Sequence, residues 1–241
     1  HPAPREPETG SGDDSAGDFD AAFAEAAVSN AERYSTPMEH NNPMEPHTTV
    51  ARWDGSELTL WTSTQGAHPA RSTLAPILGL DPDRIRIISP HVGGGFGSKG
   101  VPHADMMLAA LAAIAVPGRP VKYAVSRQQM FSITGYRAPT LQHIRLGARA
   151  DGTLTAFAYD AVSMSSQTKE FPEEATKPGR MMYAGDNRRL TQRVVPLDVP
   201  VPSWMRAPGE APGMVGLEIA MDELAVAAGL DPIELRVRNE P

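Results

Sequence analysis

The feature that most constrains this chain is a run of ten residues that contains five glycines, His91-Val92-Gly93-Gly94-Gly95-Phe96-Gly97-Ser98-Lys99-Gly100. The residues before it, 84–88, alternate in the manner of a strand, and residues 103–116 are typical of a buried Ala-rich helix. Glycine lets the backbone come close to a ligand, and the start of a helix offers free N–H groups to an anion. A tight turn between strand and helix would need the same residues, so this pattern alone leaves both interpretations open.

The common nucleotide-binding patterns do not account for this loop. Gly95, Gly97 and Gly100 satisfy G-x-G-x-x-G, but a dinucleotide site expects an acidic residue about 20 positions later. Residues 106–150 contain no Asp or Glu. The Gly-Lys-Ser/Thr of a phosphate-binding P-loop is also absent, as are G-x-S-x-G, H-E-x-x-H and an EF-hand loop. The sequence therefore disfavours dinucleotide-dependent enzymes, NTPases, serine hydrolases of the nucleophile-elbow type and zincins.

Composition and charge exclude further classes. Lys and Arg number 22 against 29 Asp and Glu, a net charge of −7, which disfavours a general nucleic-acid binder. The chain has no Cys, so it can supply neither a disulfide nor the thiolates of an iron–sulfur cluster. The longest apolar run, residues 106–116, is too short for a membrane span of about 20 residues. The first residue is His1, and we expect a fragment or a processed chain.

The pattern along the chain predicts an α+β fold, with hairpins and a mixed sheet packed against Ala-rich helices. Residues 1–18 hold five acids, three Pro and three Gly without a large aliphatic side chain, and we expect a flexible acidic linker there. Residues 19–241 are expected to form one domain. Two hairpins are predicted, 48–53 with 58–62 and 141–148 with 154–161, because Asp-Gly turns join the strands. Further elements expected are helices at 70–78, 103–116 and 214–228, a short helix from Asp231, strands at 121–125 and 193–199, and a polar excursion at 163–187.

Three other features have both a functional and a structural interpretation. Trp204 to Gly213 present Arg206 between Pro and Gly residues just before a helix, which suits the binding of an oxyanion or a substrate but equally a surface turn. His40, Glu45 and His47 lack helical spacing, and we interpret them as loop hydrogen-bonding residues rather than metal ligands. The acid-free window 106–150 carries six basic residues that either face an anionic cofactor or an acidic subunit or lie on solvated strand edges. These are Arg119, Lys122, Arg127, Arg137, Arg145 and Arg149.

Five motifs in order resemble the molybdenum-binding large subunit of the xanthine dehydrogenase and aldehyde oxidase family, from about Phe19 to Pro241. The likeness is strongest to the bacterial three-subunit aldehyde oxidoreductases. The motifs are Asn42-Pro43-Met44-Glu45-Pro46-His47, Ser63-Thr64-Gln65, Gly93 to Lys99, Gly118-Arg119-Pro120-Val121-Lys122, and Met205-Arg206-Ala207-Pro208-Gly209 followed by Glu218 and Met221 to Ala225.

The resemblance implies a molybdopterin cofactor with molybdenum, in the cytosine dinucleotide form, bound between two large α+β domains of which this chain is the first. It implies cofactor-binding roles for Gln65, for the loop residues Gly94, Gly95, Phe96 and Gly97, and for Arg206 and Ala207, with Gln65 and Arg206 also serving catalysis. No side chain is expected to ligate the metal directly. Partner subunits would carry 2Fe-2S clusters and FAD, and the location would be cytoplasmic, or periplasmic by export with a partner.

Two departures from the family pattern narrow the reaction that the resemblance implies. Gly100 and Pro208 stand where purine-oxidising members carry a Glu and a Phe, which favours the oxidation of small aldehydes to acids, or of related heterocycles, with water as the oxygen source. The family's general-base Glu lies in a G-x-G-E segment that this chain lacks, so we expect the remaining C-terminal domain to supply it and the isolated chain to be inactive. The alternative hypothesis is a non-catalytic assembly module whose basic window binds acidic partner subunits.

Overall fold

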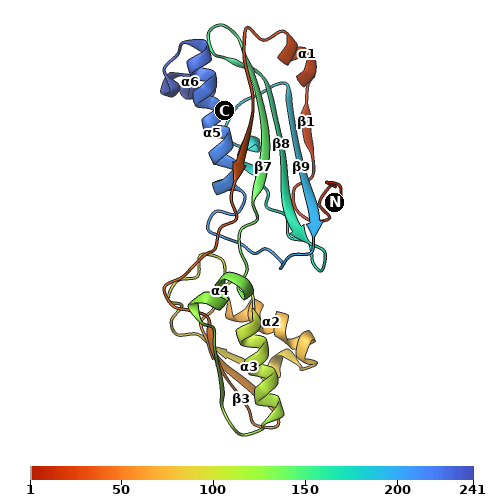
Figure 1. Cartoon of the computed structure of the whole chain (residues 1–241), viewed down its shortest axis with the longest axis vertical. Coiled ribbons are helices and arrows are strands. Elements are labelled where there is room, and N and C mark those ends of the chain that lie inside the picture. Colours follow the sequence, from red (N-terminus) through yellow and green to blue (C-terminus); the bar gives the residue numbers. More distant parts are fainter. Residues whose placement is uncertain (1) are drawn as a thin grey trace. The chain divides into compact units, whose positions relative to one another are not determined.

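A computed structural model describes residues 2–241, and these residues form two compact units (Figure 1). The large-sheet unit comprises the chain up to Met38, Ala138–Val201 and Ala207–Pro241. The small-sheet unit comprises Glu39–Arg137 and Pro202–Arg206. The small-sheet unit is therefore one long insertion into the large-sheet unit, completed by a second segment of five residues.

The large-sheet unit is a five-stranded sheet with the order β1-β9-β8-β7-β2. Its long hairpin turns at Asp151-Gly152, and burial alternates along β7 because one face of the sheet packs on the core. Ile144, Tyr159 and Leu217 are fully buried there. The elements are β1 (Asp14–Ala16), α1 (Phe19–Ala24), β2 (Val28–Thr36), β7 (Thr140–Ala148), β8 (Leu154–Ser166), the 3₁₀ turn η2 (Lys177–Arg180), β9 (Arg188–Leu197), α5 (Glu210–Ala228) and α6 (Pro232–Arg238).

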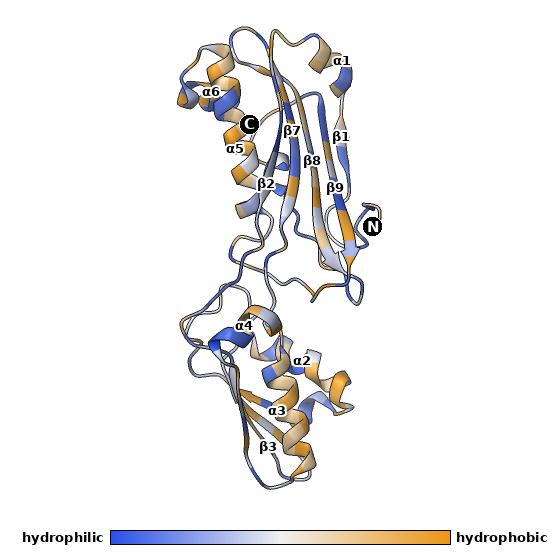
Figure 2. Ribbon diagram, in the orientation of Figure 1, coloured by the Kyte–Doolittle hydropathy of each residue, from blue (hydrophilic) through white to orange (hydrophobic). Residues whose placement is uncertain are grey.

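The small-sheet unit is a four-stranded sheet with the order β5-β4-β3-β6, in which β4 and β5 are parallel and the other pairs antiparallel. The Ala-rich helix α3 packs against β3, and its small side chains permit close contact with the sheet. Figure 2 shows its apolar character. The elements are β3 (Thr48–Trp53), β4 (Leu58–Thr62), α2 (Ala67–Leu78), the 3₁₀ turn η1 (Pro82–Arg84), β5 (Ile85–Ile88), α3 (Ala104–Ala115), β6 (Val121–Ala124) and α4 (Arg127–Ile133).

The expected α+β fold with mixed sheets and both hairpins is confirmed. Several boundaries differ from those expected. Helix α5 begins at Glu210 and includes Pro212 in its first turn, where a missing N–H costs no hydrogen bond. Strand β9 begins at Arg188, and β8 extends to Ser166 into the expected polar excursion. Helix α4 was not predicted, although Ser126 and Gln129 form a capping box at its start.

The N-terminal segment differs from the flexible linker expected for residues 1–18. Asp14–Ala16 pairs with β9 as an edge strand, and Arg5 bridges Val194. Arg193 of β9 donates two hydrogen bonds to the Asp13 carboxylate, at 2.6 and 2.7 Å. Strand pairing and contacts between charged groups were not expected for this segment, because its side chains carry no apolar pattern.

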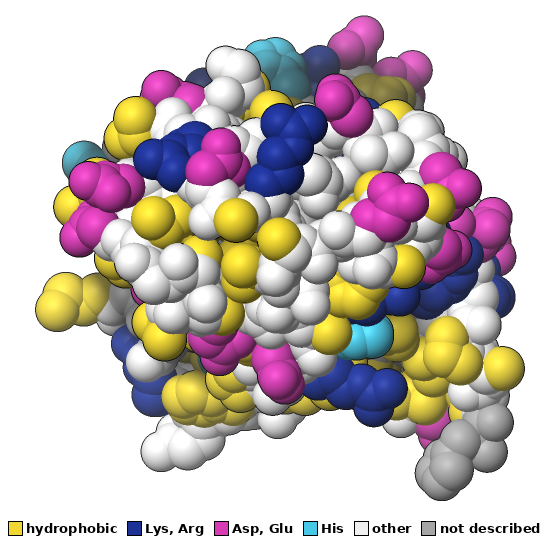
Figure 3. Space-filling model, turned by 90° about the horizontal axis from the view of Figure 1, so that it is seen from above, with side chains coloured by type: hydrophobic (Ala, Val, Ile, Leu, Met, Phe, Trp, Pro, Cys, Tyr) yellow, Lys and Arg dark blue, Asp and Glu magenta, His cyan; other side chains and the backbone are white. Residues whose placement is uncertain are grey.

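The basic residues of the window 106–150 are divided between the two units, with four in the small-sheet unit and two in the large-sheet unit. Arg127 donates to the carbonyls of Pro43 and Met44, and Arg137 donates to the carbonyls of Met205 and Arg206. Arg145 pairs with Asp160 at 2.6 Å. Acidic and basic side chains are also interspersed on the face of the molecule in Figure 3. Three of the six cations of this window thus serve contacts within the chain, and a basic surface for acidic partners stays a prediction. Among the described residues, no helix is long and apolar enough to cross a membrane.

Candidate functional site

The glycine loop, residues 93–97, lies between β5 and α3 in the small-sheet unit. Gly93, Gly94 and Gly97 have positive φ angles of 62°, 87° and 104°. The carbonyl of Gly95 accepts hydrogen bonds from both the N–H and the hydroxyl of Ser98. In contrast, the N–H groups of Gly94, Gly95 and Phe96 find no acceptor among residues 2–241. The loop thus offers three consecutive backbone donors, the arrangement that suits an oxygen-rich anion.

Gln65 lies just beyond β4 and contacts the glycine loop directly. Its backbone N–H donates to the carbonyl of Lys99 at 2.8 Å, and its Oε1 accepts from the N–H of Gly97 at 2.9 Å. A Cβ added at Gly95 would come within 2.3 Å of Gln65 Oε1, so a side chain at that position would displace the Gln65 amide. The Gln65 side chain is exposed, and its Nε2 has no acceptor within the described part of the chain.

Arg206 is brought to the same loop by its backbone. Its N–H donates to the carbonyl of Phe96 at 2.9 Å, and Arg137 donates from one guanidinium nitrogen to the carbonyls of Met205 and Arg206. Asn41 joins the two segments, since its Nδ2 donates to the carbonyls of Phe96 and Trp204. The Arg206 side chain is exposed and makes no hydrogen bond or ion pair with residues 2–241. Its guanidinium is therefore available to an anionic ligand.

Strained backbone coincides with these motifs. Within the described residues, the non-glycine residues with positive φ are Asn42, Phe96 and Ala207, at 43°, 54° and 56°. Such conformations are costly for residues with a side chain and concentrate at functional sites. Ala207 follows Arg206 in the chain but belongs to the large-sheet unit, where its carbonyl accepts from the N–H of Ala211 at the start of α5. Gln65, residues 94–97 and Arg206 are thus grouped within one unit, and Ala207, the next residue in the chain, is the first residue of a segment of the other unit.

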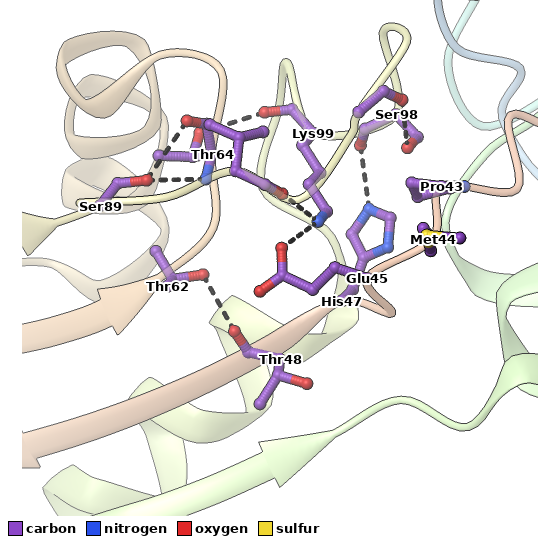
Figure 4. A network of polar contacts seen from close by, with 12 residues as sticks. Pro43, Met44, Glu45, His47, Thr48, Thr62, Thr64, Ser89, Ser98 and Lys99 are labelled. Carbon is purple, nitrogen blue, oxygen red and sulfur yellow. Dashed lines mark hydrogen bonds and ion pairs between the residues drawn. The ribbon is translucent and has the colours of Figure 1, made fainter.

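Sequence reasoning missed an ion pair behind the loop (Figure 4). The Lys99 side chain is fully buried, and its ammonium lies 2.8 Å from Glu45 Oε2 and 2.6 Å from the carbonyl oxygen of Val92. Both residues stand in motifs that the sequence analysis quoted, but a pair separated by 54 positions has no local signature. The one signal in the sequence for a buried cation was that Lys99 stands among glycines and small residues.

Two histidines lie beneath the loop without forming a metal site. The rings of His47 and His103 contact edge to face at 5.7 Å between centroids, and His47 Nε2 lies 3.3 Å from the carbonyl oxygen of Ser98. Burial lowers the pKa of His47, and it lowers the pKa of His103 to about 4. Asp105 accepts from Thr49 Oγ1 at 2.7 Å, and no group of three or more potential metal ligands occurs in residues 2–241. Burial thus favours the neutral form of both rings, of which His47 is buried and His103 half-buried.

Comparison with known proteins identifies the family. The model of the molybdopterin cofactor-binding domain matches residues 3–240. The chain belongs to the molybdopterin cofactor-binding domain family. The aldehyde oxidoreductase molybdenum-binding subunit PaoC of Escherichia coli strain K12 is 46% identical over 228 residues, which cover 95% of this chain and 31% of PaoC. This domain therefore spans about a third of the length of that relative, and the expected family is confirmed.

Solved structures agree with this family assignment. Aldehyde oxidoreductase from Desulfovibrio gigas matches with a TM-score of 0.87 and 30% identity, over 95% of this chain and 26% of that chain. Quinoline 2-oxidoreductase from Pseudomonas putida 86 matches with a TM-score of 0.87 and 25% identity, over 95% of this chain and 30% of that chain. The fold of this molybdopterin cofactor-binding domain is thus shared by enzymes whose names denote different substrates.

The donor set of the small-sheet unit fits such a cofactor. A molybdenum centre with its pterin presents oxygen atoms and negative charge, which need hydrogen-bond donors and cations. Hydrogen-bond donors are supplied by the Gln65 amide, by the Arg206 guanidinium and by the N–H groups of residues 94–96, which have no acceptor in the described part of the chain. No acidic side chain is hydrogen-bonded to Gly94, Gly95 or Phe96 in the described residues.

Proposed function

We propose that the native-length protein is a molybdenum hydroxylase that oxidises aldehydes to acids with water as the oxygen source. The observation that carries the proposal is that one unit holds the Gln65 amide, the N–H groups of residues 94–96, which have no acceptor in residues 2–241, and Arg206, whose backbone N–H bonds Phe96. The names of two relatives, the PaoC subunit and the Desulfovibrio gigas enzyme, support the aldehyde assignment.

The residues of this chain would bind and orient the reactants. The N–H groups of Gly94, Gly95 and Phe96 and the Nε2 of Gln65 would donate to oxygen atoms of the cofactor. The Arg206 guanidinium would stabilise negative charge that develops on an oxygen atom. This electrostatic stabilisation is larger in a site that excludes water. When bound, the cofactor supplies the two-electron oxidation.

The aldehyde preference rests on two positions. Gly100 and Pro208 replace a hydrogen-bonding acid and an aromatic ring of purine-oxidising family members, and neither can recognise a purine in that way. A Cβ at Gly100 would lie 3.1 Å from the carbonyl oxygen of Gly97 and 3.6 Å from the Trp204 ring, so a larger side chain would disturb the loop. Relative kcat/KM values for benzaldehyde, acetaldehyde and xanthine test the preference.

The base and the electron acceptors would lie outside this chain. Glu210 pairs with Lys177 at 2.5 Å, and Glu218 is bonded to Tyr183 and Arg236, so both acids have structural partners. We therefore assign the general base to the remaining domain of the native protein. The cytosine dinucleotide form of the cofactor, 2Fe-2S and FAD on partner subunits, and a cytoplasmic rather than periplasmic location complete the proposal. Nucleotide analysis, optical spectra and cell fractionation test these parts.

Substitution of Gln65 provides the direct test of the site. Gln65→Ala removes the amide and its bond to Gly97 while leaving the sheet intact, so turnover should fall by about 100-fold with partner subunits still bound. An exposed control, Arg86→Met, should retain activity. Unchanged turnover in Gln65→Ala would reject this site. A non-catalytic assembly module is disfavoured because three of its six expected surface cations are committed to internal contacts.

A further inference from the structure

The buried lysine behind the glycine loop ties together segments that are far apart in the sequence. Its ammonium bonds Glu45 at 2.8 Å and the Val92 carbonyl at 2.6 Å, and its own carbonyl accepts from the N–H of Gln65 and the hydroxyl of Thr64. Figure 4 shows Lys99 pointing inward between these groups. One residue therefore holds both ends of the loop and the strand end that carries Gln65.

Glu45 completes this connection from the other side. Its backbone N–H donates to the carbonyl of Gly93 at 3.1 Å, and its side chain lies so close to Gly93 that an added Cβ would come within 2.3 Å of Oε2. The Glu45 side chain is 43% exposed, whereas Lys99 is 0% exposed. Removal of Glu45 would leave a buried ammonium with one neutral acceptor, which is unfavourable.

We propose that the Lys99–Glu45 pair is a positioning device that holds the N–H groups of residues 94–96 in the orientation required for the cofactor. Neither side chain needs to touch the cofactor, because Val92 and Gly93 transmit their contacts to the loop. The proposal rests on the proposed function for its cofactor part. The conformational part concerns this chain alone.

The test uses the native-length protein, purified with its subunits from a host that makes molybdopterin. Two variants break the pair, Lys99→Met and Glu45→Ala, and a conservative one, Glu45→Gln, keeps a neutral oxygen acceptor. The matched control is Thr62→Val, which removes buried hydroxyl contacts to Thr49 and Thr48 in the same unit without contacting the loop. Hydrogen exchange of peptides that cover residues 92–99, molybdenum per chain and the thermal midpoint are measured for each.

We expect Lys99→Met and Glu45→Ala to speed exchange of the loop amides by about ten-fold or more. Molybdenum per chain should fall by about ten-fold, as for other partners that orient a metal site indirectly. Glu45→Gln should retain at least about half of the molybdenum, and Thr62→Val should keep wild-type content at a similar or lower thermal midpoint. If Lys99→Met does not fold, Glu45→Ala carries the same prediction.

Two results would overturn the positioning role. One is wild-type loop exchange and molybdenum content in both pair-breaking variants. The other is an equal loss of molybdenum in Thr62→Val, which would indicate a general loss of stability. If the wild-type protein itself holds no molybdenum, the proposed function fails, and loop exchange then decides the conformational part alone.

Discussion

The side-chain oxygen of Gln65 accepts a hydrogen bond from the backbone N–H of Gly97 at 2.9 Å. This bond fixes the amide so that Nε2 is the group left to donate. This orientation of the amide requires glycine at position 95, because a Cβ there would lie 2.3 Å from Gln65 Oε1 and 2.8 Å from its Cδ. The orientation of the Gln65 amide therefore depends on the presence of glycine at position 95 of the loop.

Gly95→Ala should therefore displace Gln65 and lower kcat/KM by about ten-fold or more. The backbone at Gly95 lies outside the left-handed region, so the change adds no φ strain, and the thermal midpoint should move little. Gly12→Ala is the control, since a Cβ at Gly12 meets nothing within 4 Å. Wild-type kinetics in Gly95→Ala would contradict the role of Gln65.

Arg206→Met should separate activity from stability. The guanidinium is exposed and has no partner in residues 2–241, so the free energy of unfolding should change by no more than about 0.5 kcal/mol. Turnover should nevertheless fall by about 100-fold if the guanidinium stabilises an oxyanion. Activity assays with parallel urea denaturation check both. A large loss of stability with full activity would instead indicate that the guanidinium has a structural and not a catalytic role.

The small-sheet unit should lose stability in acid. Burial holds the pKa of His103 at about 4 and lowers that of His47, against an ordinary value of about 6.5. Below that value the unfolded state binds protons that the folded state excludes, so stability is full above pH 6.5 and falls as the pH drops toward 4. His103 alone lowers the free energy of unfolding at pH 5 by about 2 kcal/mol relative to its value above pH 6.5.

Tryptophan fluorescence can measure this loss, because Trp53, Trp61 and Trp204 all belong to the small-sheet unit. The free energy of unfolding of the 241-residue chain, measured in urea, should be lower at pH 5 than at pH 7.5 in the wild type. The difference should be smaller in His103→Gln. Exposed His68→Gln is the control and should keep the wild-type dependence. Equal stability of the wild type at both pH values would contradict the prediction.

The large-sheet unit depends on a buried hydroxyl. Tyr159 Oη lies 2.7 Å from Gln142 Oε1 and 3.0 Å from the carbonyl oxygen of Gly213 in α5. Tyr159→Phe should cost about 1–3 kcal/mol of unfolding free energy, because both acceptors lose a buried partner. Tyr123→Phe, on β6 of the other unit, is the control. Urea denaturation followed by circular dichroism gives the comparison, and a cost equal to that of the control would count against the contact.

Local signals in the sequence predicted local structure well. The hairpin at 48–62 was predicted from Asp54-Gly55, and Asp54 Oδ1 indeed accepts from the N–H groups of Ser56 and Glu57. The edge strand at 14–16 was missed, because its partner Leu190 is remote and its side chains carry no apolar pattern. Long-range pairing of polar segments leaves no periodic signature.

The candidate site follows the same rule. Gln65, residues 94–97 and Arg206 could be named because each stands in a recognisable motif, and their proximity in the small-sheet unit agrees with that prediction. The Lys99–Glu45 pair could not be predicted, because it depends on how the loop folds over Val92. Their roles toward the cofactor stay predictions until the variants are measured.

The measurement that tests the central claim most directly is molybdenum per chain, by elemental mass spectrometry, on the native-length protein purified from a cofactor-competent host. The account predicts close to one molybdenum per chain in wild type and a marked loss in Lys99→Met. A well-folded wild-type protein, complete with its partners and without molybdenum, would contradict it.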